Sequence, residues 1–480
     1  MTSRIIYASV LTAVLLTGCG EQYLELGPRS QVSDVNFFKT AGDFNLATRG
    51  VYDALQNRSY QESSWGMMEL VSDNTLTVTT PGSFGETWYQ VDEFRVLTDN
   101  RLMQAQWQTS YQLINRANLV LSKLEATAID SKAKDQFQGE AQFLRAYTYF
   151  NLVRLFGEVP LVITPTVNPF EAFNQLREPV DKVYAQIIAD LQSAEQKLPD
   201  AYTGNDIGRA TRWAAKGLLA KVYLTRKNYT EATTRLREIV SSGKFDLLPG
   251  YADVFRPNNA NHKESLFEIQ FKAGLGTDRE GSPFADAMSP QDARIWGGNS
   301  GGGQGNNVPT EDLVNAYEKG DLRKDLSIGQ LKAGERGNPP LSFYQKKFSS
   351  PPTATLDHDD NFIVLRYADV LLMLAEALNE QGYGNAEAFT ALNRVRKRAG
   401  LADLTQADVP SQAAFRTALL QERRVELAFE NHRWFDLLRF GVAQPVLTAK
   451  NYRIQPYQLL FPVPQRERDL NPALAQNPGY

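Results

Sequence analysis

The sequence predicts a mainly α-helical protein, in which pairs of helices form the scaffold and long irregular loops and minor β elements complete it. Apolar residues from Tyr367 to Leu378 recur at offsets of 0, 3, 4, 7, 8 and 11, and a second such stripe runs from Phe137 to Leu155. These offsets place apolar side chains on one face of a helix with ~3.6 residues per turn. Strand-like segments are few, so helices dominate the expected fold.

The remaining elements follow from the same patterns. Further segments with a helical period are 104–125, 180–198, 211–225, 230–241, 385–398 and 415–440. Segments with the composition of strands are 266–272, 342–348 and 459–463. The chain has 480 residues, enough to bury a large core without disulfides.

The N-terminus has the features of a secretory signal. Arg4 precedes an apolar run from Ile5 to Leu16, which is too short to span a bilayer that needs ~20 residues. The run ends in Leu16-Thr17-Gly18-Cys19, which resembles the lipobox of bacterial lipoproteins, and Cys19 is the one cysteine of the sequence. We therefore expect a signal peptide over residues 1–18 and lipidation of Cys19, which would tether the protein to a membrane. An ordinary cleavage site with a chance cysteine is the alternative.

Two pairs of predicted helices share a spacing of small residues. Leu219-Ala220-x₂-Tyr223 is followed by Ala232-x₃-Leu236, and Leu374-Ala375-x₂-Leu378 is followed by Ala388-x₃-Leu392. This spacing matches the tetratricopeptide repeat, in which alanine lets the second helix approach the first. Two unrelated helical hairpins would give the same pattern. On either interpretation, stacked helix pairs form a solenoid-like scaffold.

Composition and motifs exclude several classes of function. Lys and Arg total 51 and Asp and Glu total 55, a net charge of −4, which argues against a nucleic-acid partner. The single cysteine and three scattered histidines predict no zinc site, and the sequence predicts no cofactor. The glycine run 297–305 has no Lys after it, so it is not a phosphate-binding loop. The acidic segment 357–361 lacks half of a calcium-loop pattern and is expected to be a solvated turn.

A cluster of carboxylates falls on an apolar helix face. Glu422 and Glu426 lie at offsets 7 and 11 of the stripe that begins at Phe415. Buried carboxylates need cationic partners, and Arg394, Arg396 and Arg398 on the preceding helix are candidates. We interpret Glu422, Glu426, Arg394 and Arg396 as a structural ion network. The alternative is a glycosidase-type acid/base pair, but catalytic carboxylates usually project from loops or strand ends.

Two regions interrupt the helical pattern and are predicted to be long loops, 59–97 and 273–309. Long loops on a compact scaffold tend to carry function. Three of the six tryptophans, Trp65, Trp88 and Trp296, lie in these regions. A tryptophan in such a loop is a candidate for presentation to a ligand, with loop packing as the alternative.

Short segments in a fixed order carry a resemblance to a known family over nearly the whole chain. They are FFKTAGDF (37–44), YQLINRAN (111–118), EAQFLRAY (140–147), FGEVPL (156–161), RYADVLL (366–372), LNRVR (392–396), ERRVEL (422–427), RWFDL (433–437), FPVP (461–464) and QNPGY (476–480). Together with Cys19, they resemble the SusD/RagB family of outer-membrane nutrient-uptake lipoproteins of Bacteroidota.

The resemblance implies a binding protein and not an enzyme. Family members bind glycans or other nutrients at the cell surface and form a lid on a TonB-dependent, SusC-like outer-membrane barrel that imports the ligand. It implies a SusD-like domain with tetratricopeptide-like pairs over residues 19–240 and a RagB/SusD domain over 241–480. The rival interpretations are a lipid-anchored glycoside hydrolase and a tetratricopeptide scaffold lipoprotein without a small ligand.

The residues of the ligand site cannot be transferred from the family, because they vary with the substrate. A flat aromatic ring covers the apolar face of a sugar, while amides, carboxylates and Arg bond its hydroxyl groups. We therefore expect Trp88 and Trp296 to converge on one shallow site. The other expected contributors are Trp65, Tyr89, Asp73, Arg294 and Asn299.

Overall fold

The computed structural model describes residues 37–79, 82, 85–168, 170, 173, 175–275, 280–289, 303–331 and 342–480. Cys19, Arg294, Trp296 and Asn299, to which the sequence assigned roles, lie outside these ranges. Within them, every helix is too short or too polar to cross a bilayer.

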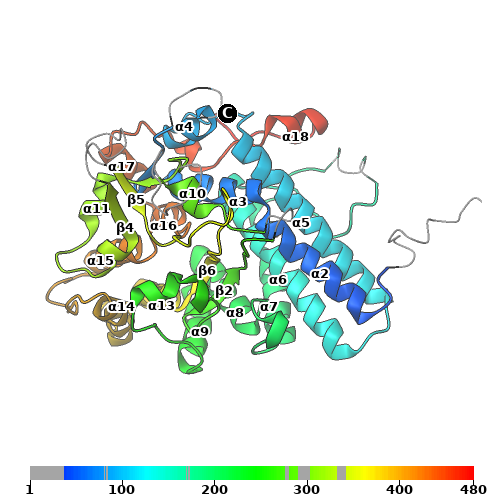
Figure 1. Cartoon of the computed structure of the whole chain (residues 1–480), viewed down its shortest axis with the longest axis horizontal. Coiled ribbons are helices and arrows are strands. Elements are labelled where there is room, and N and C mark those ends of the chain that lie inside the picture. The colour runs from blue at the N-terminus through cyan, green and yellow to red at the C-terminus, as the bar shows by residue number, and fades with distance from the viewer. Residues whose placement is uncertain are drawn as a thin grey trace, which may run out of the picture.

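Long helices dominate the structure, which confirms the predicted fold class (Figure 1). In the first half of the chain they are α2 (Ala41–Gln56), α5 (Arg101–Ala126), α6 (Ser131–Phe156), α7 (Val180–Lys197), α8 (Arg212–Thr225) and α9 (Tyr229–Ser241). In the second half they are α13 (Tyr367–Gln381), α14 (Ala386–Arg398), α15 (Gln412–Glu426), α16 (Arg433–Phe440) and α17 (Ala443–Ala449). Each helix from α5 to α9 packs on the next, and α13 packs on α9 and α14. The stack therefore continues from one half of the chain into the other.

Polar N-caps explain where many helices begin. At α2, the Thr40 hydroxyl accepts a hydrogen bond from Asp43 N (3.2 Å), and the Asp43 carboxylate accepts one from Thr40 N (2.8 Å). This reciprocal pair satisfies two backbone donors that the helix leaves unbonded. Side chains also cap α5, α6, α8, α9, α14 and α15, from Asn100, Asp130, Thr211, Asn228, Asn385 and Ser411 respectively.

The two predicted pairs of helices are α8 with α9 and α13 with α14. Ala220 and Ala232 in the first pair, and Ala375 and Ala388 in the second, are all buried. A larger side chain at these positions would separate helices that are in contact, because interiors are close-packed.

The prediction of an irregular loop over residues 59–97 is wrong. The segment contains α3 (Arg58–Trp65), a π-helical turn η2 (Gly66–Leu70), strand β1 (Thr75–Leu76) and α4 (Glu86–Asp92). Its serines suggested a loop, but the Ser63 and Ser64 hydroxyls donate to the carbonyl oxygens four residues earlier, at 2.6 and 2.8 Å. Such bonds satisfy a hydroxyl inside a helix, so a Ser-rich segment can be buried and helical.

The described strands form three two-stranded antiparallel sheets. Strand β1 pairs with β3 (Val308–Pro309), β2 (Ser265–Ile269) with β6 (Phe362–Arg366), and β4 (Ile328–Leu331) with β5 (Ser342–Gln345). The predicted strands at 266–272 and 342–348 contain β2 and β5. The predicted strand at 459–463 is wrong, because a 3₁₀ turn, η8 (Pro456–Leu459), precedes it and Phe461 N donates to Leu155 O at the end of α6 (2.8 Å).

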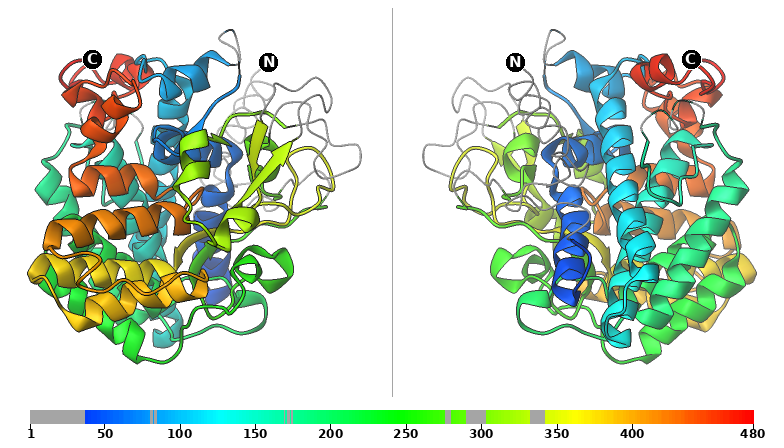
Figure 2. Two further views of the ribbon diagram at one scale, coloured as in Figure 1. Left: turned by 90° about the vertical axis from the view of Figure 1, so that its left-hand side faces the viewer. Right: turned by 90° about the vertical axis from the view of Figure 1, so that its right-hand side faces the viewer.

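The remaining short helices lie in the connections between these elements. They are α10 (Phe284–Met288), α11 (Glu311–Ala316), α12 (Arg323–Ser327) and α18 (Gln465–Leu470), with 3₁₀ turns η4 (Gly204–Asp206), η5 (Tyr251–Phe255) and η6 (Pro257–Asn259). Gln465 N at the start of α18 donates to Thr98 O before α5 (2.8 Å). The C-terminal segment, red in Figure 2, thus returns to the N-terminal half of the chain.

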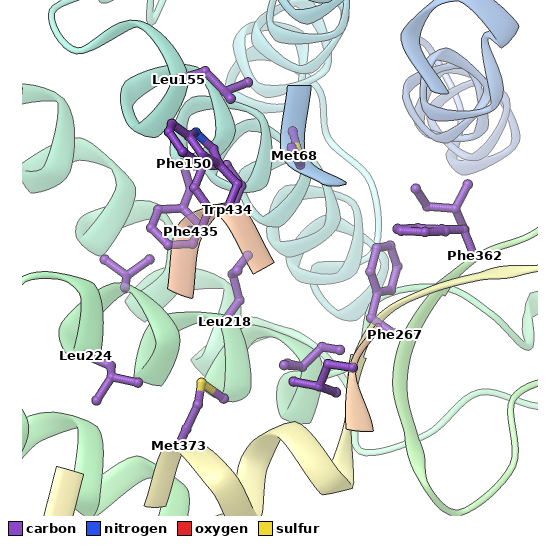
Figure 3. Packing of buried hydrophobic residues seen from close by; sticks show 14 of the residues in the cluster. Met68, Phe150, Leu155, Leu218, Leu224, Phe267, Phe362, Met373, Trp434 and Phe435 are labelled. Carbon is purple, nitrogen blue, oxygen red and sulfur yellow. The ribbon is translucent and has the colours of Figure 1, made fainter. Parts of the chain in front are cut away.

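One core connects the two halves. Trp434 and Phe435 from α16 lie beside Phe150 of α6 and Leu218 of α8 (Figure 3). The predicted helical segment 415–440 therefore forms two helices, α15 and α16, and the chain turns between them where Phe429 and Asn431 have φ values of 68° and 62°. The turn points α16 into the core.

Candidate functional site

A cavity of about 540 Å³ opens between α3, α4, the start of α5 and the segment after residue 303 (the α3–α4 cavity). Its described lining residues are Arg58, Ser59, Glu62, Ser63, Thr79, Gly85, Thr87, Trp88, Arg101, Leu102, Ala105, Gln304 and Asn306. This volume lies in the range of ~300–1,000 Å³ that is typical of small-molecule sites. The cavity thus joins helices from the N-terminal region to a segment about 200 residues later.

Trp88 forms an apolar wall that cannot easily move. Its ring stacks on Trp65 with a centroid distance of 4.3 Å and an interplanar angle of 1°. Trp65 is fully buried, whereas Trp88 is 9% exposed and lines the cavity. A Cβ at Gly66 would lie 2.9 Å from Trp88 Cζ3 and 2.8 Å from Leu102 Cδ1, so only glycine allows this approach. Trp65 and Gly66 therefore fix the orientation of Trp88.

Polar groups surround this wall. Arg58 Nε donates to Glu62 Oε1 (2.8 Å), and Arg101 Nε lies 3.4 Å from Thr87 Oγ1. Asn306, 3% exposed, donates from Nδ2 to Gln304 Oε1 (3.1 Å). Its own Oδ1 is buried and has no hydrogen-bond partner among the described residues. This oxygen has almost no exposed surface, so the charged groups that line the cavity and are open to a ligand are those of Arg58, Glu62 and Arg101.

Only some of the residues predicted for the ligand site lie at the α3–α4 cavity. Trp88 lines the cavity, Trp65 supports it from inside the core, and Tyr89 is half-buried beside Trp88 on α4 without lining the cavity. Because α4 is a helix, Trp88 and Tyr89 do not point to opposite sides as they would on a strand. Arg294, Trp296 and Asn299 lie outside the described residues, so the convergence of Trp88 and Trp296 stays a prediction.

Asp73 lies outside the cavity and has structural partners. Its Oδ1 accepts from Arg433 Nε (2.7 Å), and its Oδ2 is 3.0 Å from Arg424 Nη2. Burial alone would raise the pKa of Asp73, but the hydrogen bond and charge of Arg433, with Arg424, hold the pKa below its usual value. Asp73 thus connects the segment after η2 to α15 and α16.

Glu422 and Glu426 belong to a buried ion network. Arg323 Nη1 donates to Glu422 Oε1 (2.6 Å) and Glu426 Oε2 (2.9 Å), Arg396 Nη1 donates to Glu422 Oε2 (3.0 Å), and Arg366 Nη1 donates to Glu426 Oε1 (2.6 Å). Burial opposes ionisation of Glu426, but the surrounding guanidinium groups hold its pKa well below the usual range. Both carboxylates are at most 2% exposed, so a substrate has no route to them.

Arg394 lies outside this network. Its Nη2 donates to Asp246 Oδ1 (2.8 Å), and its Nη1 to the Tyr367 hydroxyl (3.0 Å). Arg398, at the end of the same helix, pairs with Glu426 instead.

Glu69 on η2 supports the turn between α15 and α16. Its carboxylate accepts hydrogen bonds from Phe429 N (3.0 Å), Asn431 N (3.2 Å) and Asn74 Nδ2 (3.2 Å). Burial nevertheless raises the pKa of Glu69 from 4.5 to about 7. The folded protein therefore binds a proton at this site more tightly than the unfolded chain.

This shift predicts a pH dependence of stability. Because the pKa of Glu69 is higher in the folded protein than in the unfolded chain, Glu69 contributes most to the free energy of unfolding below about pH 4.5. This contribution is lost as the pH rises through about 7, and the loss is roughly 3 kcal/mol at most. Glu69→Gln cannot titrate, so urea unfolding from pH 4.5 to 8 should show wild type losing stability relative to this variant. A difference between the two proteins that stays constant with pH would contradict the assignment.

Comparisons with known proteins agree with this architecture. A family model described as SusD family matches residues 331–458, and a second, described as starch-binding associating with outer membrane, matches residues 22–224. The chain is similar to SusD-like protein P25 of Formosa agariphila, with 29% identity over 96% of each chain, and to SusD-like protein P2 of the same organism, with 28% identity over 99% of each.

Solved structures show the same fold. A laminarin binding SusD-like protein has a TM-score of 0.81 and 29% identity, over 92% of this chain and 100% of that one. Surface glycan-binding protein A from Bacteroides fluxus has a TM-score of 0.81 and 26% identity over the same shares. The region matched by the first family model contains all of α13 to α17 and much of the ion network. The chain belongs to the SusD family.

Proposed function

We propose that the protein is a lipid-anchored binding protein of the cell surface that captures an oligosaccharide in the α3–α4 cavity and delivers it to a TonB-dependent, SusC-like outer-membrane barrel. The description of the N-terminal family model, associating with the outer membrane, supports the location. Relatives that bind laminarin or surface glycans support the class of ligand. The lipid anchor at Cys19, the outward orientation and the barrel partner follow from the lipobox and the family.

The observation that carries the proposal is the fixed Trp88 wall of a cavity that polar side chains also line. A sugar has an apolar face of C–H groups, which packs on a flat ring, and a rim of hydroxyl groups, which donate to oxygen acceptors. A wall that is already ordered loses little conformational entropy when the ligand binds. The Arg58, Glu62 and Arg101 side chains add polar contacts at the mouth of the cavity.

The same residues disfavour a hydrolase. Most glycosidases use two carboxyl groups, about 5–9.5 Å apart, on either side of the scissile bond. Glu62 is the one carboxylate among the described lining residues, and Arg58 binds it. The cavity can therefore bind a sugar chain, but its described residues lack the pair that hydrolysis requires.

Calorimetric titration of Trp88→Ala tests the proposal. The panel comprises four neutral hexasaccharides, one each of glucose, mannose, galactose and xylose. Laminarihexaose is the glucose member. Loss of the aromatic wall should weaken binding by ~2 kcal/mol or more, about 30-fold, because central aromatic residues dominate binding energy.

Tyr89→Ala is the matched control, because Tyr89 is the next residue of α4 and does not line the cavity. Circular dichroism should show both variants folded. The proposal fails if Trp88→Ala is folded and binds every hexasaccharide as tightly as wild type does.

A further inference from the structure

A second cavity, larger than the first, lies further along α5. Its volume is about 670 Å³, and its walls come from the middle of α5, described residues between 160 and 175, and α18 with the residues that follow it (the α5–α18 cavity). In Figure 1, α18 lies near the upper part of α5. The two cavities share α5 but no lining residue.

The walls of the α5–α18 cavity are cross-braced. Tyr111 Oη donates to Pro160 O (2.8 Å), and Thr166 N donates to Asn115 Oδ1 (2.8 Å), which ties the 160–166 segment to α5. Gln108 Nε2 donates to Glu467 Oε1 (2.9 Å), which ties α5 to α18. The cavity is therefore formed before any ligand binds, as in most small-molecule sites.

These hydrogen bonds also restrict what the cavity can recognise. Val162 N donates to the Tyr149 hydroxyl (2.7 Å), and Val162 O and Thr164 O accept from Asn118 Nδ2 (3.0 and 3.1 Å). A peptide that adds a strand needs free backbone groups on the wall. Because these backbone groups already have partners, they do not offer a free strand edge to a peptide.

The side chains combine an apolar floor with neutral polar groups. Trp107 and Tyr111 pack with their ring centroids 5.3 Å apart, and Leu470 on α18 is 49% exposed. Gln112 and Arg466 are exposed at the rim, and the structure gives neither a hydrogen bond nor an ion pair with a described residue. Arg466 and Glu467 are the charged residues among the described lining residues, and their opposite charges cancel. This chemistry fits an uncharged ligand with apolar faces and many hydroxyl groups.

We infer that the α5–α18 cavity is a second binding site for a neutral oligosaccharide. The inference goes beyond the proposed function, with which it shares the class of ligand and none of the residues. Tyr111 and Leu470 form the surface under the sugar rings, and Gln112 and Arg466 bond the hydroxyl groups. Two sites on one protein would also hold a long glycan at two points, which raises avidity without new contacts.

Titration with the four neutral hexasaccharides named above tests this inference. Wild type should bind the tightest of them at two sites per protein, and Trp88→Ala should retain one site. The rim variant Gln112→Ala/Arg466→Ala should weaken that remaining site at least tenfold. Tyr111→Leu should do the same, whereas Tyr111→Phe keeps the ring and loses only the hydrogen bond to Pro160 O, so it should weaken the site less than Tyr111→Leu does. The rim residues are exposed, so their variant tests the site even if Tyr111→Leu does not fold.

The outcomes separate this inference from the proposed function. Two sites of wild-type affinity in the rim variant, or no binding by Trp88→Ala at millimolar hexasaccharide, would overturn the second site and leave the first intact. If Trp88→Ala behaves as wild type and the rim variant loses all binding, the second site stands and the α3–α4 assignment fails. If the rim variant instead loses a SusC-like barrel in co-purification and keeps both sugar sites, this face docks protein and the inference is wrong.

Discussion

Replacing Glu426 with alanine should lower the free energy of unfolding by about 3–5 kcal/mol at neutral pH, the usual cost of removing one partner from a buried ion pair. The variant leaves Arg366, Arg323 and Arg398 with one carboxylate fewer between them, in a site without exposed surface. Chemical denaturation followed by circular dichroism measures the change. Affinity of the folded fraction for a glycan should stay the same, because Glu426 does not line either cavity.

Glu387→Ala is the control for this variant. Glu387 also binds an arginine, Arg237 (2.6 Å), but both side chains are at least 40% exposed. Exposed ion pairs contribute about 0–1 kcal/mol, so the control should unfold almost like wild type. Equal costs for the two variants would contradict the ion network. Wild-type stability combined with lost glycan processing would restore an enzymatic role for Glu426.

Replacing Cys19 with alanine should abolish membrane attachment. If acyl chains on Cys19 anchor the protein, each methylene that they bury in the membrane contributes about 0.8 kcal/mol to membrane binding. The variant has no acyl chains and loses this whole contribution. The variant should lose labelling by a fatty-acid probe and leave the membrane fraction. Glu21→Ala, two residues beyond the lipobox, should behave as wild type. Labelling of Cys19→Ala at the wild-type level would contradict the anchor.

Helical periodicity identified most of the scaffold, because amphipathic helices repeat their apolar residues at a fixed spacing. The stripe from Tyr367 to Leu378 became α13, and the small residues Ala220 and Ala375 marked two pairs of packed helices. The segment that forms α3 and η2 escaped detection, because its serine hydroxyls bond within the helix and its buried face includes polar side chains such as Gln61.

The candidate sites were harder to predict from the sequence than the scaffold, because their residues are brought together by tertiary contacts. Trp88 stood out as an aromatic residue in a polar region, but Arg58 and Asn306, which share its cavity, come from separate segments. The offsets of Glu422 and Glu426 indicated burial, yet Arg323 and Arg366 lie at least 56 residues away in sequence and had no local signal. Gln304, within the glycine run, and Asn306, just after it, were not singled out in the sequence, although both line the cavity.

The most direct test of sugar binding in the α3–α4 cavity is a crystal structure of the protein with the tightest-binding hexasaccharide of the panel. We expect electron density for a sugar ring packed against Trp88, about 4 Å from the indole plane. A saturated crystal in which the α3–α4 cavity contains no sugar, while the sugar is bound at another place on the protein, would contradict the central claim.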